Sequence, residues 1–364
     1  MTGPADGPGR LSPGSATSTA AAFDAFVEAN PRATYLQLAA WGTVKAPNGW
    51  RSRLVDVPLP QAGRIGARVL LRRPGPLPWT FAYAPRGPIA EPWTADVLAA
   101  FTDAARRALG AGLPRGALLR IDPEIEAGGP LDVDGATGAA LRALGWQPAP
   151  EIQPSVTRIV DLRADEAALW ADLRAKWRQY VNRARARGVT VEDAGEGGLA
   201  DFVAIMAETE RRTGTAMRAG SAYRDLWAAF APAGRARLLL ARGPAGDAQA
   251  GLLLVRCGRR VVEPYGGMTA AGAESRANYL VKWEAIRSSR TAGAVSYDMW
   301  GLVHPGIRQF KEGFGGREVR FIGGWELVLD RLGAGVYRLA ERRSRHQPAL
   351  TAASATRAGA EEVP

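Results

Sequence analysis

The stretch FKEGFGGREVRFIGGWELVLD, residues 310–330, determines the predicted fold because an earlier segment repeats its plan. In this stretch a helix ends before Gly313 and an aromatic residue, and a strand then runs to Asp330. Earlier in the chain, Gly145 and an aromatic residue also follow a helix, and a strand then runs to Asp161 with nearly the same spacing. We therefore predict two copies of one α/β unit rather than a chance likeness between two mixed segments.

Around these two copies, apolar periodicity predicts alternating helices and strands, which is an α/β (α+β) chain with mixed sheets flanked by helices. The expected helices are residues 23–30, 94–109, 135–144, 166–187, 199–213, 222–230 and 278–292. The expected strands are residues 51–58, 66–72, 117–121, 157–162, 237–242, 250–257, 260–265, 295–299 and 324–329. Each copy includes a strand with an acidic residue at or near its end, Asp122 in the first and Asp298 in the second.

The composition indicates an ordinary globular chain. Its 364 residues suit two domains, and 46 % of them are apolar and 23 % charged. Residues 1–21 and 342–364 are expected to be disordered tails, the second of them basic. The first domain is expected over residues 22–153, completed by 325–341, and the second over 154–324. No apolar run approaches the roughly 20 residues of a membrane span, and no secretory signal is expected.

Few residues can serve as metal ligands or histidine bases. Cys257 is the one cysteine, and His304 and His346 are the two histidines. This count disfavours zinc enzymes, histidine-triad hydrolases and disulfide scaffolds. Cys257 lies in an expected strand without a cationic helper and is interpreted as an inert buried thiol. A loop or surface role is expected for His304.

The charge is strongly positive, with 47 basic and 36 acidic residues and a net charge of +11. This excess predicts a polyanionic partner such as a nucleic acid, a nucleotide sugar or an anionic membrane surface. Arginine enrichment alone explains it equally well, and that alternative stays open. Only four residues are lysine: Lys45, Lys176, Lys282 and Lys311.

Five polar and aromatic stretches fall at expected strand ends and loops, where α/β proteins gather their ligands. They are residues 35–50, 79–88, 265–267, 297–301 and 310–315. The second stretch, WTFAYAPRGP, is expected to hold Arg86 in a rigid loop of prolines and glycine. Because two of the four lysines belong to these stretches, we predict that they form one site.

Taken in chain order, eight segments resemble the Fem-type peptidyltransferases of peptidoglycan synthesis, over about residues 23–341. They are YLQLAAWGTVK (35–45), YAPRGPI (83–89), LRIDPE (119–124), IQPSVTRIVDL (152–162), LRAKWRQYVNRARARGV (173–189), NYLVKWEAI (278–286), YDMWG (297–301) and FKEGFGGREVRFIGGWELVLD (310–330). The resemblance implies two GNAT-like acyltransferase domains. Residues 165–213 are too few for the long helical hairpin of some members, so the compact form is expected.

The resemblance also implies roles for individual residues. Lys45 is expected to hold the phosphates of a nucleotide-sugar precursor, and Arg218 to supply a second phosphate contact. The other substrate-binding candidates are Trp41, Arg86, Tyr223 and Tyr265. The catalytic candidates are Lys311, Asp122, Asp298 and Phe310. The candidates for tRNA binding, with Arg174 beside them, are Lys176, Arg178, Arg183, Arg185 and Arg187.

Fem-type enzymes move an amino acid from aminoacyl-tRNA to an amine of the precursor's stem peptide, so the same reaction is expected here. The donor ester is already activated, and no covalent enzyme intermediate is needed. The amine must lose a proton, and the tetrahedral oxyanion needs donors worth about 3–4 kcal/mol each. Asp122 is expected to orient or desolvate the amine, with Asp298 as the second candidate. Lys311 faces either the oxyanion or the tRNA 3′ phosphate.

Two other functions remain open at this point. A GNAT-type N-acyltransferase that uses acyl-coenzyme A requires a pyrophosphate loop between a strand and a helix. The only candidate motif, RALGAG at residues 107–112, falls at an expected helix end, where the helix dipole disfavours an anion. The third possibility is a protein that binds tRNA or precursor without catalysis.

The resemblance implies aminoacyl-tRNA as co-substrate, with no cofactor and no metal. The acceptor is a nucleotide-linked or lipid-linked muramyl-peptide precursor. The expected location is the cytoplasm, with peripheral contact at the inner face of the membrane as one option. The transferred amino acid (Gly, Ala, Ser or Thr), the acceptor amine, any role in antibiotic resistance and the oligomeric state stay open.

Overall fold

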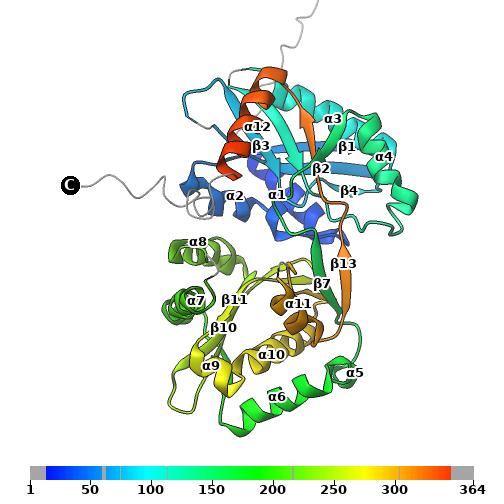
Figure 1. Ribbon diagram of the computed structural model, residues 1–364. Helices are drawn as coiled ribbons and strands as arrows, with labels where there is room; N and C mark the ends of the chain where they lie inside the picture. The colour runs from blue at the N-terminus through cyan, green and yellow to red at the C-terminus, as the bar shows by residue number, and fades with distance from the viewer. Residues whose placement is uncertain are drawn as a thin grey trace, which may run out of the picture.

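The computed structural model describes residues 14–59, 63–73, 75–112, 114–214, 217–302 and 304–345. These residues form two α/β domains, one above the other in Figure 1, each built on a mixed seven-stranded sheet. The fold is therefore the α/β arrangement with two similar domains that the repeated sequence plan predicts.

The first sheet has the strand order β1-β2-β3-β5-β14-β6, with β4 also paired to β2. Its strands are β1 (Arg51–Leu59), β2 (Gly63–Arg72), β3 (Trp79–Ala84), β4 (Ile89–Glu91), β5 (Arg115–Ile121), β6 (Trp146–Ala149) and β14 (Gly324–Val328). Only β3 and β5 run parallel in it; the other neighbours are antiparallel.

The second sheet has the order β13-β7-β12-β11-β10-β9-β8. Its strands are β7 (Val156–Asp161), β8 (Thr190–Asp193), β9 (Ala236–Arg242), β10 (Ala248–Cys257), β11 (Arg260–Met268), β12 (Ser296–Asp298) and β13 (Arg317–Arg320). Again one pair, β11 and β12, is parallel, and the other pairs are antiparallel.

The two sheets exchange a strand. Each sheet includes one strand that directly follows, in the chain, an edge strand of the other sheet. This strand pairs beside the two parallel strands. Thus β7 follows β6 of the first sheet but pairs in the second, and β14 follows β13 of the second sheet but pairs in the first. The two crossings run between the domains in Figure 1, and this exchange ties the domains together at two points.

Helices cover both faces of each sheet. In the first domain α3 packs against β1, β2 and β5, and α12 packs against β5. In the second, α7 packs on β10 and β11, while α10 packs on β9, β10 and β11 and supports α6. The α-helices are α1 (Gly14–Ala29), α2 (Ala39–Lys45), α3 (Ala95–Gly110), α4 (Ala136–Ala143), α5 (Glu166–Asp172), α6 (Ala175–Ala186), α7 (Leu199–Thr213), α8 (Gly220–Phe230), α9 (Ala270–Ser275), α10 (Ala277–Thr291), α11 (Pro305–Glu312) and α12 (Arg331–Arg345). Short 3₁₀ turns are η1 (Tyr35–Gln37), η2 (Ala46–Asn48), η3 (Val133–Gly135), η4 (Glu196–Gly198) and η5 (Ala231–Ala233).

Local sequence explains why these segments fold as they do. In α3 the Thr94 side chain accepts a hydrogen bond from the Val97 N–H, and the buried positions recur at helical spacing. One core cluster is shared by both domains, because Leu36 and Trp41 of the first pack with Phe202 and others of the second. The domains therefore meet through buried apolar surface as well as through the exchanged strands.

The expected single helix over residues 166–187 is wrong, because α5 and α6 are separated by extended backbone at Leu173 and Arg174. The Arg174 N–H donates to the Gly313 carbonyl oxygen at 2.9 Å, so a contact distant in sequence stabilises the break. A Cβ at Gly313 would come within 2.3 Å of the Trp177 ring, so only glycine allows α6 to approach so closely. The apolar periodicity of the sequence predicts neither of these two contacts.

Three other expectations also differ from the structure. Residues 79–84, expected as part of a rigid loop, form β3 inside the first sheet. Helix α1 begins at Gly14, within the segment predicted to be disordered, and α12 continues to Arg345, past the expected boundary at residue 341. The remainder of both expected tails, including His346, lies outside the described residues.

Candidate functional site

The acidic ends of two strands face the boundary between the domains. Asp122 follows β5 and Asp298 ends β12, and these are the matching strands of the two parallel pairs. We call Asp122, Glu124 and Asp298, with Arg86 and Arg260, the carboxylate network. All five side chains are buried. Since buried charges must be paired, their partners decide what the network can do.

Arg260 joins the two domains through this network. From β11 its guanidinium donates to Glu124 of the first domain and to Asp298 of its own domain. The Arg86 Nε atom lies 3.3 Å from Glu124 Oε1, which extends the chain of charges to the loop after β3. A guanidinium that bridges two carboxylates holds both of them in one geometry. The network therefore fixes the relative positions of Asp122 and Asp298.

Asp122 accepts three hydrogen bonds from its own domain. The Tyr83 hydroxyl donates at 2.7 Å, and the backbone N–H groups of Arg86 and Gln153 donate at 2.6 and 3.2 Å. Burial raises the pKa of Asp122 to about 6, although Arg86 and these hydrogen bonds oppose the rise. Arg86 itself has a left-handed backbone, with φ of 56°. Through these hydrogen bonds, Asp122 holds the loop that carries Arg86 in a fixed orientation.

Asp298 is ionised more easily than an ordinary aspartate. Burial by itself raises its pKa, but Arg260, Thr157 and the Trp300 N–H outweigh burial, and the pKa is lowered. The Trp300 N–H donates to Asp298 Oδ1 at 2.7 Å, and the Thr157 hydroxyl donates to the same oxygen. Asp298 is thus a fixed negative charge that shapes the turn over residues 299–301.

Lys311, at the end of α11, lies against that turn. Its ammonium donates to the carbonyl oxygens of Trp300 and Gly301, at 3.0 and 2.8 Å. Burial and the nearby Lys282 lower the pKa of Lys311 to about 8, while Glu263 and Asp298 oppose this shift. An ammonium has three N–H bonds, and the described residues occupy two of them. Lys311 therefore keeps one donor for a bound group.

Phe310 lies in an aromatic group beside Lys311. Its ring packs edge-on against Tyr279 and Phe314, with centroids 5.2 Å apart in both pairs. The Lys282 ammonium lies 5.7 Å from the Phe310 ring centroid and pairs with Glu263. Phe310 therefore packs beside a second buried lysine, whose charge is balanced by Glu263.

At the other end of the boundary, Lys45 and Arg218 place two positive charges together. The Lys45 ammonium lies 4.5 Å from the Trp41 ring centroid. Burial lowers the pKa of Lys45 to about 8, and Arg218 lowers it further against the opposing charge of Asp225. We call Lys45, Trp41, Arg218, Tyr223 and Tyr265 the Lys45 cluster.

The Lys45 cluster also contains an unused donor. Within the described part of the chain, the buried Trp41 Nε1 has no hydrogen-bond partner, and the Tyr223 hydroxyl interacts with the Arg218 backbone. The Tyr223 and Tyr265 rings pack edge-on at 5.0 Å, and burial raises the pKa of Tyr265 while Arg218 opposes the rise. An unsatisfied buried donor beside two cations is typical of an anion-binding site.

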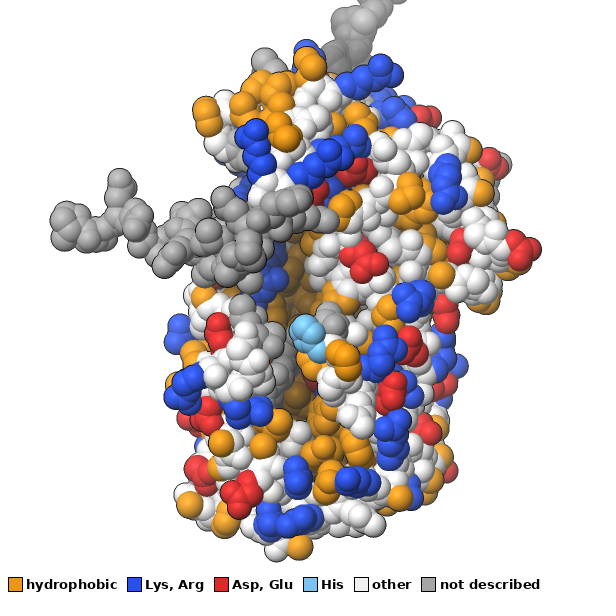
Figure 2. Space-filling view, in the orientation of Figure 1, with side chains coloured by type: hydrophobic (Ala, Val, Ile, Leu, Met, Phe, Trp, Pro, Cys, Tyr) orange, Lys and Arg blue, Asp and Glu red, His pale blue; other side chains and the backbone are white. Residues whose placement is uncertain are grey.

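Tyr35 connects the two ends of the boundary. Its ring lies 5.5 Å from Trp41 and 6.1 Å from Trp300, between centroids. Its pKa is raised well above the usual value by burial, and Tyr265 and Asp298 raise it further. The catalytic and substrate-binding candidates named from the sequence thus lie along one boundary. Figure 2 shows a recess lined with hydrophobic side chains beside α11.

The basic helix lies elsewhere. In Figure 1 α6 is at the end of the second domain far from the first. Two of its arginines and the arginine that follows it have partners, because Arg178 donates to the Ala171 carbonyl, Arg185 pairs with Glu284, and Arg187 donates to the Glu274 carbonyl. Lys176 and Arg183 are exposed. These two side chains are the ones that the geometry leaves for a phosphate backbone.

Sequence reasoning missed Arg260, Glu124, Glu263, Lys282 and Tyr35 as site residues. A signal for two of them was present, because Arg260 and Glu263 are charges inside an otherwise apolar expected strand. A charge buried in a strand needs an opposite charge nearby. Which partner it finds depends on the packing of the two domains.

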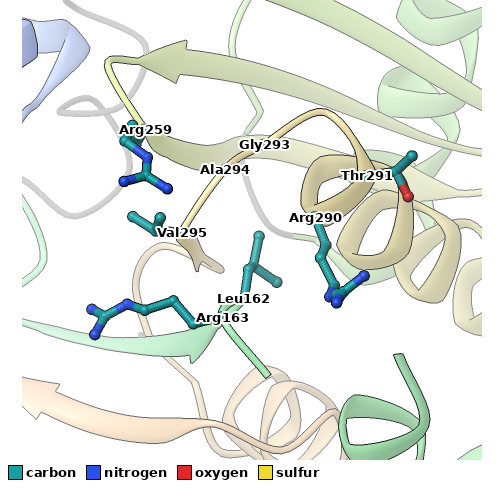
Figure 3. A pocket seen from close by; sticks show the side chains of 8 residues that line it. All are labelled: Leu162, Arg163, Arg259, Arg290, Thr291, Gly293, Ala294 and Val295. Atoms are coloured by element: carbon teal, nitrogen blue, oxygen red, sulfur yellow. The ribbon is translucent and has the colours of Figure 1, made fainter. Parts of the chain in front are cut away.

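A separate hollow of about 460 Å³ lies at the start of β12, away from Asp298. It is lined by Leu162, Arg163, Arg259, Arg290, Thr291, Gly293, Ala294 and Val295. Figure 3 shows the Arg290 side chain pointing away from the side on which Arg163 and Arg259 lie. The three guanidinium groups do not converge, so we assign no ligand to this hollow.

Two further sequence expectations concern single residues. Cys257 is buried, and burial raises its pKa, which keeps the thiol protonated and unreactive. His304 is exposed and immediately precedes α11. None of the described helices combines the length and the hydropathy that a membrane span requires.

The two sheets, each with one parallel pair and an exchanged strand, define a tandem GNAT-like protein. Residues 171–312 match the model of the acetyltransferase (GNAT) domain, and residues 18–128 match that of the FemAB family. The crystal structure of FemX superposes with a TM-score of 0.78 at 23 % identity, covering 88 % of this chain and 98 % of that one.

Curated relatives agree with these matches. The lipid II:glycine glycyltransferase of Staphylococcus saprophyticus is 30 % identical over 229 residues, which are 61 % of this chain and 54 % of that protein. The protein of the same name from Staphylococcus aureus is 30 % identical over 234 residues, 60 % of this chain and 52 % of that protein. The chain spans about half the length of these relatives.

Proposed function

We propose that this protein is an aminoacyltransferase that moves an amino acid from aminoacyl-tRNA to an amine of the stem peptide of a peptidoglycan precursor. The observation that carries the proposal is the boundary itself, where a cation pair at Lys45 and Arg218 is connected through Tyr35 to the buried ammonium of Lys311. The names of the curated relatives support the same chemistry. With aminoacyl-tRNA as donor, the proposal also includes a cytoplasmic location for the reaction.

The reaction needs one bond exchange. The stem-peptide amine attacks the ester carbonyl, a C–N bond forms, and the C–O bond to the tRNA ribose breaks. The proton lost by the amine ends on the departing ribose hydroxyl. Because the ester is already activated, neither a covalent enzyme intermediate nor a cofactor is required. Fixed positions for both substrates supply much of the rate, through effective molarity.

In this scheme Lys311 donates its remaining N–H to the oxyanion that forms at the ester carbonyl. The carbonyls of Trp300 and Gly301 hold the ammonium in place, so little reorganisation is needed when charge develops. Asp122 and Asp298 act as positioning residues, because each carboxylate is held by three protein donors, which fix the Arg86 loop and the 299–301 turn. The substrate amine is thus expected to release its proton toward the leaving hydroxyl.

Lys45 and Arg218 bind the phosphates of the precursor in this scheme. We expect Lys45→Met to raise the KM for the precursor by about 10- to 100-fold with little change in kcat, since a charge-assisted hydrogen bond is worth about 1.5–3 kcal/mol. Steady-state kinetics at saturating aminoacyl-tRNA measures this. Arg163→Gln, which removes an exposed charge remote from Lys45, is the matched control. A fall in kcat at unchanged KM would contradict phosphate binding by Lys45.

Lys176 and Arg183 are expected to contact the tRNA backbone. The double variant Lys176→Gln/Arg183→Gln should weaken tRNA binding and lower the slope of log affinity against log salt by about two, one for each phosphate that is no longer neutralised. Filter binding at several salt concentrations gives the slope. The charge-matched control is Arg163→Gln/Arg256→Gln, at positions outside α6. An unchanged slope would indicate that tRNA binds outside α6.

A transfer assay tests the proposed function as a whole. Purified protein is incubated with radiolabelled aminoacyl-tRNA and either a nucleotide-linked or a lipid-linked precursor. Label that enters the precursor in a form resistant to mild base, and is lost after RNase pretreatment of the tRNA, supports the proposal. Transfer from acyl-coenzyme A alone would identify a GNAT-type N-acyltransferase instead. Binding of both partners without transfer would indicate a non-catalytic protein.

A further inference from the structure

The outward face of α12 is apolar. Leu332, Val336 and Leu339 follow one another at spacings of four and three residues, so they lie along one side of the helix. Their side chains are 75 %, 42 % and 51 % exposed. The opposite side packs on the first sheet, where Ala334 is buried and the Tyr337 ring stacks on Phe81. The helix is held by its inner face, and the three side chains are not needed for that packing.

A fourth exposed apolar residue lies in the turn that leads to β3, close in the chain to a contact with α12. Leu77, in the turn before β3, is 38 % exposed. The ring of Trp79, two residues further on, packs against Gly333 of α12. Arg73 donates to the carbonyl oxygens of Pro76 and Leu77, which fixes the turn beside the helix. Figure 2 shows apolar side chains gathered at this end of the molecule.

The charges around this surface have one sign. The exposed charged residues of α12 with described side chains are Arg331, Arg342 and Arg343. The two acids nearby face other partners, because Asp330 accepts a hydrogen bond from the Gly333 N–H and Glu341 pairs with the buried Arg120. We call Leu332, Val336 and Leu339, with Arg331 and Arg343, the α12 patch.

We propose that the α12 patch docks on the surface of an anionic lipid bilayer. An exposed apolar stripe bordered by arginine is the arrangement by which a helix lies in the bilayer interface, with the apolar side chains among the acyl chains and the guanidinium groups at the phosphates. The positive border favours a negatively charged membrane over a neutral one, and the net charge of +11 acts in the same direction.

The patch is built into the part of the first domain that carries Lys45. Tyr337 stacks on Phe81 at 4.4 Å, and Phe81 contacts Trp50 at 6.0 Å. Trp50 follows η2, which continues directly from α2 and Lys45. The α12 patch and the Lys45 end of the boundary are therefore joined through one packed part of the first domain. This suits an acceptor whose phosphates are attached to a lipid, and it extends the proposed function without depending on it.

Vesicle sedimentation tests the inference. The full-length protein is mixed with vesicles of phosphatidylcholine and phosphatidylglycerol in equal parts, or of phosphatidylcholine alone, without tRNA or precursor. We expect binding to the mixed vesicles, at least about a tenfold loss of partitioning in Leu332→Ser/Leu339→Ser, and little binding to the neutral vesicles. The control is Leu131→Ser/Val133→Ser, which removes two exposed apolar side chains outside the patch. Thermal unfolding confirms that both variants are folded.

Three results would overturn the inference. The first is equal partitioning of the α12 variant and the parent protein, and the second is equal binding to charged and neutral vesicles. The third is a parent protein that is dimeric while the α12 variant is monomeric, which would assign the patch to a second copy of the chain. Because the assay contains no reactants, a negative result leaves the proposed transfer reaction untouched, and failed transfer leaves vesicle binding intact.

Discussion

Lys311→Met is expected to lower kcat for aminoacyl transfer by about 10²–10³-fold, the cost of losing one preorganised oxyanion donor. Methionine keeps most of the apolar stem, so the packing beside Phe310 is retained while the two hydrogen bonds to the 300–301 turn are lost. Single-turnover kinetics with preformed aminoacyl-tRNA isolates this step from product release. An unchanged single-turnover rate would remove Lys311 from the chemistry.

The pH dependence of kcat gives an independent test of Lys311. Deprotonation of the substrate amine makes the rate rise with pH, whereas Lys311 with a pKa of about 8 loses its positive charge above that pH. The expected profile rises with pH and levels off near pH 8, because further deprotonation of an amine with a pKa of about 10.4 then offsets the loss of the Lys311 charge. Saturating precursor removes the separate effect of Lys45 on binding. In Lys311→Arg the levelling-off should disappear and the rate should keep rising with pH, because a guanidinium stays charged. A levelling-off near pH 8 that persists in this variant would assign it to another group.

Arg260→Met is expected to lower the free energy of unfolding by about 3–5 kcal/mol, because it leaves Glu124 and Asp298 buried without their shared cation. Urea unfolding followed by tryptophan fluorescence measures this loss. The control is Arg242→Met, whose partners Glu192 and Asp201 are half exposed, and it should cost about 0–1 kcal/mol. A loss no greater than the control's would mean that the network does not hold the domains together.

Arg260→Met should also change stability in acid. The pKa of Asp298 is lowered in the folded protein from the ordinary value of 3.8, so its ionisation stabilises the fold above that pH. This contribution disappears as the pH falls through the lowered value. Without Arg260 the main group that lowers the Asp298 pKa is gone. The variant should therefore lose less stability than the parent protein when the pH is lowered. Unfolding measured between neutral and acidic pH separates this slope from the overall destabilisation.

Most of the elements were predictable because their causes are local. The apolar spacing of α3 and the Thr94 cap lie within a single segment. The break between α5 and α6 was not predictable, because it depends on a hydrogen bond from Arg174 to Gly313, more than a hundred residues further along the chain. The two glycines at equivalent positions of the sequence repeat, Gly145 and Gly313, are required for different structural reasons. Gly145 adopts a left-handed backbone with φ of 87°, while Gly313 makes room for Trp177.

By itself the sequence determined that two similar α/β units are present, that a cysteine or histidine mechanism is disfavoured, and which lysines and aspartates accompany aromatic residues at strand ends. These are properties of residue types and short spacings, on which local periodicity depends. The tertiary structure alone decided that the units exchange β7 and β14, that Arg260 bridges Glu124 and Asp298, and that Tyr35 connects the Lys45 and Lys311 ends. The reason is that burial and charge pairing act between segments far apart in the chain, and the partner of a buried charge is chosen only when the domains pack.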